Sequence, residues 1–215
     1  MSGNGGRPVR SATKKTDRRI VRTRDRLGDA LIALIQEKPF ESVTVQEVLN
    51  RAGVSRSTFY QHFEDKNDLF LSDAADFLEK LSTVLSRRGD RSKRVAPVGE
   101  FFEHVAQSRG IYSALVAANR LHDFLDLAQE YFARGIEQRF KEIPASSSIA
   151  PKQRVAMAQA HAGAMISLLT WWVQAGAKGS AADMDELFHR MVWSGIDPVA
   201  GASRRATTQI QRLQK

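Results

Sequence analysis

Residues 56–62 of this chain carry side chains of the types that read the edges of DNA bases. Arginine can donate two parallel hydrogen bonds to guanine, and glutamine can pair in the same bidentate way with adenine. Serine, threonine and tyrosine hydroxyls can hold base edges or backbone phosphates. The candidates for base contact are Arg56, Ser57, Thr58, Gln61 and His62. Because Phe59 and Phe63 are four residues apart, we expect them to share the opposite, buried face of one short helix.

A helix-start signal precedes this segment and would help to position it. Thr44 and Glu47 have the spacing of a capping box, in which each side chain hydrogen-bonds the backbone N–H of the other residue. Val43 and Val48 flank that box at the positions of a hydrophobic staple. The sequence therefore predicts a helix that begins after Thr44 and runs to about Ala52.

A glycine turn then leads into the candidate reading helix. Gly53 can adopt the positive φ at which helices often end, and Ser55 can cap the next helix two residues later. Two short helices joined by about three residues are typical of a helix-turn-helix, whose second helix enters the major groove of DNA. The alternative is a helical hairpin that serves packing alone, with Tyr60 as a partly buried core aromatic and His62 as an ordinary surface residue.

Positive charge is concentrated at the N-terminal end of the chain. The formal net charge is +8, and residues 1–62 hold 12 Lys and Arg against 6 Asp and Glu. A clustered basic surface favours a polyanionic partner, although ordinary solvated helices can have the same composition. Residues 1–17 are rich in small and basic residues, and we expect a disordered basic arm. The side chains of this arm that could enter a minor groove, or simply stay solvated, are Arg7, Arg10, Lys14 and Lys15.

Apolar periodicity predicts helices on both sides of the candidate site. The first covers about 18–38 and stops before Pro39, because the residue before a proline avoids helical angles. Later helices are expected at about 66–87, 95–108, 110–119, 121–142, 152–175 and 181–195. No run of alternating β-branched residues indicates a strand. We therefore expect an all-α fold of about nine helices.

The expected domain organisation follows from these elements. After the arm at 1–17, the sequence predicts a three-helix helix-turn-helix domain at 18–72 and a larger C-terminal helical domain at 73–198. A flexible basic tail is predicted at 199–215. No apolar run approaches the roughly 20 residues that span a bilayer. The N-terminus also lacks the apolar stretch of a secretory signal. We therefore expect a cytoplasmic protein without a membrane partner.

The composition argues against most enzyme chemistry. The chain has no cysteine, which excludes thiol catalysis, disulfides and cysteine-based zinc sites. Its five histidines include no pair at His-x-x-x-His spacing, so neither a metal nor a resident cofactor is expected. Asp123 and Asp126 beside His122 are interpreted as solvated charges on a helix surface. An enzyme is therefore kept only as the weakest alternative.

The segment TVQEVLNRAGVSRSTFYQHFEDKNDLF resembles the DNA-binding motif of the TetR/AcrR family of regulators. The shared pattern is a threonine, an aliphatic residue, Ala-Gly-Val-Ser, then a tyrosine, a phenylalanine, a lysine and a leucine. Here these positions are Thr44, Val48, Ala52-Gly53-Val54-Ser55, Tyr60, Phe63, Lys66 and Leu69. Leu49 departs from the family, which often has alanine there. The resemblance covers about residues 18–75.

This resemblance implies a function as well as a fold. Such a protein is a DNA-binding transcriptional regulator, most often a repressor that a small-molecule effector releases from a palindromic operator. Thr44, Tyr60 and Lys66 would hold backbone phosphates of the double-stranded operator. The effector would bias two arrangements of the helix at 66–87. The alternative is a DNA-binding protein without a small-molecule effector, which a fully packed core would favour.

The C-terminal domain would then carry an effector pocket and the interface of a homodimer. For each pocket candidate ordinary core packing is the favoured alternative; the candidates are Phe101, Phe102, His104, Tyr112, Leu115, His161, Met165 and Trp172. In the family the last two long helices form a four-helix dimer interface. The matching candidates are Ala156, Ala160, Gly163, Leu168, Trp171, Leu187, Phe188 and Met191. Trp171 and Trp172 point about 100° apart on a helix, so we expect them to face different surfaces; the alternative is that both are core.

Overall fold

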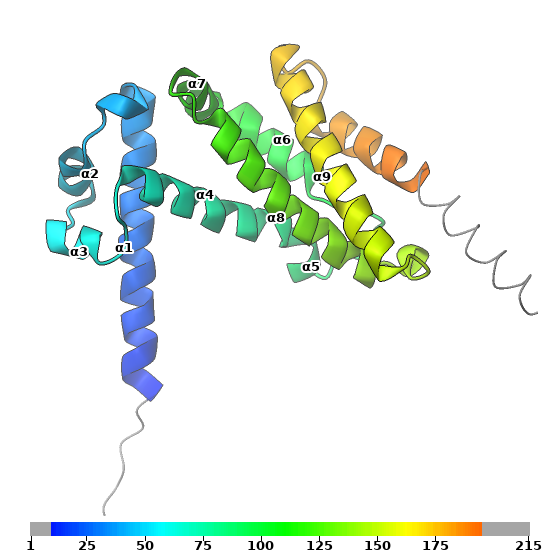
Figure 1. Cartoon of the computed structure of the whole chain (residues 1–215), viewed down its shortest axis with the longest axis horizontal. Helices are drawn as coiled ribbons and strands as arrows, with labels where there is room; N and C mark the ends of the chain where they lie inside the picture. The colour runs from blue at the N-terminus through cyan, green and yellow to red at the C-terminus, as the bar shows by residue number, and fades with distance from the viewer. Residues whose placement is uncertain (1–9, 195–215) are drawn as a thin grey trace, which may run out of the picture. The chain divides into compact units, whose positions relative to one another are not determined.

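The computed structural model describes residues 10–194, with side chains from Arg19 onward, and every regular element in that range is a helix (Figure 1). The α-helices are α1 (Arg10–Glu37), α2 (Val45–Ala52), α3 (Arg56–Tyr60), α4 (Lys66–Ser82), α5 (Val84–Arg87), α6 (Val98–Gln107), α7 (Arg109–Ala117), α8 (Leu121–Glu142), α9 (Pro151–Gln174) and a helix at 181–194. Two short 3-10 helices are η1 (Phe40–Ser42) and η2 (Pro144–Ser146). The predicted all-α fold is confirmed.

One predicted boundary differs from the structure at the N-terminal end. Helix α1 begins at Arg10, inside the segment 1–17 for which the sequence predicts a disordered arm. Residues 10–17 contain neither glycine nor proline, so a helix nucleated in the amphipathic part can propagate back through them. The rest of the predicted arm and the predicted tail at 199–215 lie outside the described residues.

The single helix predicted at 66–87 is wrong, because the chain breaks it at Thr83 into α4 and α5. The Thr83 hydroxyl donates to the carbonyl oxygen of Glu79 at 2.7 Å, and Thr83 has φ −99° and ψ 0°. Such a hydroxyl competes with the backbone for the carbonyl of the preceding turn. A Cβ on Gly135 of α8 would lie 2.5 Å from the Ser82 carbonyl oxygen. The backbone beside the break therefore packs directly on the backbone of α8, and any side chain at position 135 would clash with it.

The described chain divides into two compact units, of which the first ends at Asp73 and also takes in residues 113–118. In this unit the short pair α2 and α3 lies beside α1 (Figure 1). Its core is apolar, and its fully buried members include Leu27, Leu31, Val48, Phe59 and Leu69. Gly28 marks a close approach of α1 to α4, since a Cβ there would lie 2.2 Å from the Asp73 carboxylate.

The second unit, residues 74–112 and 119 onward, is built around the pair α8 and α9, which run side by side (Figure 1). Aromatic pairs bind the helices together, with ring centroids 4.9 Å apart for Phe101 and Phe132. The guanidinium of Arg139 is buried and donates to the carbonyl oxygens of Asp90, Ser92 and Arg94 at 3.0–3.2 Å. One side chain of α8 therefore fixes the backbone of the polar segment between α5 and α6.

Candidate nucleic-acid interface

The start of α2 is fixed by the predicted capping box. The Thr44 hydroxyl accepts from the Glu47 N–H, and the Glu47 carboxylate accepts from the Thr44 N–H at 2.9 Å. The staple valines, Val43 and Val48, are both buried. The local signals read from the sequence are confirmed, and they set where α2 begins.

The turn between α2 and α3 is also as predicted. Gly53 has φ +61° and ψ +41°, the left-handed conformation that glycine adopts without strain. The Ser55 hydroxyl accepts from the Thr58 N–H at 3.2 Å and therefore caps α3. Only one residue, Val54, separates the glycine from the cap, so the direction of α3 is closely defined by α2.

Helix α3 has the two faces that its sequence predicts. Phe59 and Phe63 are buried with their ring centroids 5.7 Å apart, and they anchor the helix. The candidates Arg56, Ser57 and Gln61 are exposed, and Thr58 and His62 are half-buried. The helix ends at Tyr60, two residues before the predicted end, and Gln61 and His62 follow in a turn whose N–H groups donate back to Ser57 and Phe59.

Tyr60 projects from the end of α3 toward solvent. Its side chain is 52% exposed, and its ring packs edge-on against Phe59 with centroids 5.2 Å apart. The alternative of a core aromatic is therefore excluded. Thr44 is also exposed, although its hydroxyl donates to Glu47 at 2.8 Å.

A side chain that sequence reasoning missed supports Arg56. The guanidinium of Arg56 donates to the side-chain oxygen of Gln46 at 3.1 Å, and the amide of Gln46 in turn donates to Asn50 at 2.8 Å. Both partners lie on the exposed face of α2. The signal available was the four-residue spacing of Gln46 and Asn50, which places them on one helix face. Arg56 is thus held by α2 before any partner binds.

Lys66, at the start of α4, has a different environment from the one that the family pattern implies. Its ammonium donates to the carbonyl oxygens of Phe40, Glu41 and Val43 at 2.8, 3.0 and 2.9 Å. It also lies 4.8 Å from the centroid of the Phe40 ring. Since an ammonium has three donors, all three are used within the protein. A phosphate contact by Lys66 stays a prediction, and it would compete with these hydrogen bonds.

A charged pair joins the start of the α1–α2 connection, directly after α1, to the capping box. The Lys38 ammonium donates to the Glu47 carboxylate at 2.5 Å and to the Ser42 carbonyl at 3.0 Å. The hydrogen bond from Lys38 to Glu47 makes the largest contribution to lowering the pKa of Glu47 from 4.5 to about 2. The hydrogen bonds from the backbone N–H and the hydroxyl of Thr44 lower this pKa further. Glu47 therefore keeps its charge, and its cap, at any ordinary pH.

A groove of about 720 Å³ lies beside the start of α3 within the first unit. Its lining comes from α1 and from the turn before α3: Arg19, Arg22, Thr23, Arg26, Gly53, Val54, Ser55 and Thr58. The sequence alone assigns the arginines of α1 no function. No signal in their spacing connects them to residues 53–58.

Known proteins share both the helix-turn-helix segment and the fold. Residues 27–72 match the family model described as bacterial regulatory proteins of the tetR family. The chain is 34% identical over 61 residues to the uncharacterized HTH-type transcriptional regulator YxbF of Bacillus subtilis, a match that spans 28% of this chain and only 16% of that protein. It is 29% identical over 143 residues to an uncharacterized HTH-type transcriptional regulator of Haemophilus influenzae, covering 58% of this chain and 67% of the relative.

A solved structure extends the likeness of fold to most of the chain. The TetR transcriptional regulator from Streptococcus agalactiae superposes with a TM-score of 0.55 at 24% identity, over 84% of this chain and 98% of that one. The family model, the relatives and this fold agree with the motif geometry described above. The helix-turn-helix segment at residues 27–72 is similar to that of the bacterial regulatory proteins of the tetR family. The resemblance predicted from residues 44–70 is thereby confirmed.

The second unit packs most of the predicted pocket residues against one another. Phe102 and Trp172 lie 5.2 Å apart, and His104 lies 4.4 Å from Phe77 and 6.4 Å from Tyr112, all measured between ring centroids. Met165 is fully buried, and His161 packs on Phe140 at 6.1 Å, whereas Leu115 belongs to the segment 113–118 that groups with the first unit.

Burial also sets the charge state of the titratable groups in this aromatic cluster. It lowers the pKa of His104 and of His161 and raises the pKa of Tyr112. All three side chains are therefore uncharged near neutral pH. An effector pocket at these residues stays a prediction.

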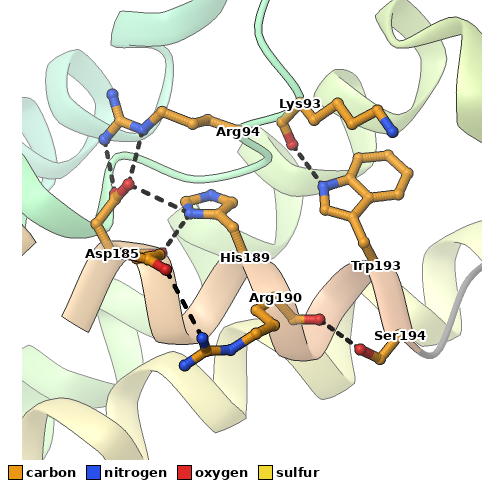
Figure 2. Close-up of a pocket in the computed structure, with 8 residues that line it drawn as sticks. Lys93, Arg94, Asp185, His189, Arg190, Trp193 and Ser194 are labelled. Atoms are coloured by element: carbon orange, nitrogen blue, oxygen red, sulfur yellow. Dashed lines mark hydrogen bonds and ion pairs between the residues drawn. The ribbon is translucent and has the colours of Figure 1, made fainter. Parts of the chain in front are cut away.

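A separate pocket of about 440 Å³ involves none of the predicted pocket residues (Figure 2). There Arg94 donates to the Asp185 carboxylate at 2.8 and 3.1 Å, and its other contacts reach Glu100. Trp193 donates from its indole N–H to the Lys93 carbonyl at 2.8 Å. Burial opposes ionisation of Asp185, but hydrogen bonds from His189 and Arg94 lower its pKa. This arrangement secures the helix at 181–194 against the segment before α6.

The predicted dimer residues divide between surface and core. Trp171 is 56% exposed and Trp172 only 2%, which confirms that the adjacent tryptophans face different surfaces. Ala156 and Ala160 are exposed, Met191 is 48% exposed, and Gly163, Leu168 and Leu187 are half-buried. Phe188 is the exception, because it is fully buried within one chain and packs edge-on against His161 of α9. Its side chain therefore offers no surface within one chain, and its place in a dimer interface stays a prediction.

The part of the chain that the structure describes holds no cluster of three or more His, Cys, Asp or Glu side chains suited to a metal ion. None of its helices combines the length and the apolar character needed to cross a membrane.

Proposed function

We propose that this chain is a sequence-specific DNA-binding transcriptional regulator that places α3 in the major groove. The observation that carries the proposal is the two-faced construction of α3. Phe59 anchors the inner face of α3, and Phe63, three residues after the helix end, is buried beside it. Because Ser55 also caps the start of α3, the polar side chains are held in a fixed position. A reading helix needs this rigidity, because a base contact fails when the donor is misplaced by about 1 Å.

Within this proposal the exposed residues of α3 divide between bases and phosphates. Arg56 and Gln61 are the strongest candidates for bidentate base contacts, with Ser57 beside them. Gln46 supports Arg56 in the geometry that it would use. Thr58 and His62 are half-buried and therefore have less surface to offer. Thr44 and Tyr60 are exposed and remain candidates for phosphate contacts.

We further infer a homodimer, because a single short helix reads too few bases for an operator. Support comes from the exposed apolar side chains Trp171 and Met191 and from the exposed small residues Ala156 and Ala160. Trp and Met are enriched at interfaces, and small residues let helices approach closely. A second copy of the chain, related by a two-fold axis, would cover this face and read the second half-site.

Ligand-released repression is the regulatory mode that we propose. Helix α4 begins in the first unit and ends in the second, so a change in the second unit has a continuous element through which to act on the first. A ligand can weaken DNA binding only by as much as it prefers the unbound arrangement. The rival, a regulator without a small-molecule effector, is favoured by the close aromatic packing around His104 and Trp172.

Selection from a library of random duplexes tests the function and requires no assumed operator sequence. The full chain is expected to enrich an imperfect palindrome, because a two-fold dimer presents α3 twice in related orientations. Enrichment of no sequence, with binding that depends on duplex length alone, would contradict the proposal.

A further inference from the structure

The groove beside α3 contains three arginines and no acidic residue among the eight that line it. Its two walls come from residues far apart in the sequence, the middle of α1 and the turn at 53–55 with Thr58. All of these residues lie in the first unit. A concave surface with one sign of charge concentrates an oppositely charged partner.

Arg26 fixes the wall of the groove. Its guanidinium donates to the carbonyl oxygens of Ala52 and Gly53, at the end of α2 where a cation is favoured by the helix dipole. A Cβ at position 53 would lie 2.9 Å from Arg26 Nη2, so a larger residue there would make this guanidinium shift. Arg26 is therefore a positioning residue that holds α1 against the α2–α3 turn.

Arg19 and Arg22, unlike Arg26, do not hold α1 against the α2–α3 turn. Both side chains are exposed, and neither guanidinium has a protein partner among the described residues. They are three residues apart on α1, which places them on neighbouring parts of one helix face, separated by about 4.5 Å along the axis. Thr23, between them and the turn, has its hydroxyl engaged with the Arg19 carbonyl at 2.9 Å.

We propose that this groove seats backbone phosphate of the DNA that α3 reads, with Arg19 and Arg22 as the contacting residues. The inference rests on the proposed function and extends it to residues outside the part of the chain that the family model matches, which begins at residue 27. Two guanidinium groups present planar, fixed donors that suit phosphate oxygens. The groove lies next to Ser55 and Thr58, so phosphate in it would flank the half-site and add affinity without reading sequence.

The test compares salt dependence in the full-length chain. The double variant Arg19→Ala/Arg22→Ala is measured against a matched control, Arg88→Ala/Arg91→Ala, which removes two exposed arginines from the second unit. Each lost phosphate contact lowers the slope of log K against log salt by about 0.9. Because each subunit of the proposed homodimer carries both arginines, the variant dimer lacks four contacts. Between 50 and 200 mM salt, the wild type should therefore lose about 150-fold more affinity than the groove variant. The control should follow the wild type.

A charge-preserving variant and a chemical probe test whether the change in slope comes from contacts with phosphate. Arg19→Lys/Arg22→Lys keeps both charges and should retain the wild-type slope. Ethylation of phosphates that flank the half-site should weaken wild-type binding and leave the Ala variant unaffected. A groove variant with the slope of the control overturns the proposal.

The proposed function can fail independently of the groove. If the wild type shows no sequence preference, the role of α3 is refuted, while the slope difference still reports whether Arg19 and Arg22 contact phosphate.

Discussion

Replacing Lys66 by methionine separates two roles for this residue, an internal tie and a phosphate contact. Methionine keeps much of the apolar stem and deletes the three hydrogen bonds to the carbonyls of Phe40, Glu41 and Val43. Hydrogen bonds to a charged group contribute about 1.5–3 kcal/mol each, and the exposed one at Glu41 is readily replaced by water. The other two give an expected loss of about 3 kcal/mol in the free energy of unfolding.

The assay is urea unfolding of the full chain, followed by a DNA titration at several salt concentrations. Lys80→Met is the control, because Lys80 is an exposed lysine on the same helix, and its unfolding free energy should change by no more than about 0.5 kcal/mol. If Lys66 serves to hydrogen-bond the carbonyls of the α1–α2 connection, Lys66→Met should be less stable than the wild type. The slope of log K for DNA binding against log salt should then be unchanged. Wild-type stability together with a slope lowered by about 1.8, one contact for each subunit of the dimer, would refute the internal role and establish the phosphate contact that the family pattern implies.

The remaining predictions concern the capping box and the dimer face. Glu47 has a folded pKa of about 2, below its ordinary 4.5, so its ionisation stabilises the fold above pH 4.5 and ceases to do so as the pH falls toward 2. The difference in stability between the wild type and Glu47→Gln, measured by thermal unfolding, should therefore narrow between pH 4.5 and 2. A difference that stays constant over this range would contradict the prediction. Trp171→Ala should weaken the dimer by about 2 kcal/mol, roughly 30-fold in Kd by analytical ultracentrifugation, with little effect on chain unfolding. Phe188→Ala should instead cost about 3–5 kcal/mol in unfolding, because it empties a core site, and equal effects of the two changes on dimer Kd would contradict this division.

Local signals in the sequence were sufficient where the structure depends on neighbouring residues. The capping box at Thr44, the left-handed Gly53 and the cap at Ser55 each involve side chains and backbone within a few positions. The inner face of α3 followed from the spacing of Phe59 and Phe63 for the same reason. These elements make up most of the candidate site, which explains why the site was readable before the fold was known.

Features that depend on distant residues were not readable in this way. Lys66 bonds carbonyls more than twenty residues earlier, and Arg26 reaches the end of α2, a distance in sequence that no local pattern spans. Periodicity showed that the last helix has apolar residues, but only its packing on α9 shows that Phe188 faces inward. The close approach of Ser82, beside the break at Thr83, to Gly135 of α8 likewise joins residues far apart in the sequence.

The central claim, that α3 reads sequence through Arg56 and Gln61, is tested most directly by removing both side chains. Arg56→Ala/Gln61→Ala is compared with Arg88→Ala/Gln107→Ala, an exposed arginine and glutamine of the second unit, on the selected operator and on a scrambled duplex. We predict that the α3 variant loses its preference for the operator while its dimerisation and its binding to scrambled DNA persist, and that the control keeps the preference. An α3 variant that still prefers the operator as strongly as the wild type would contradict the account.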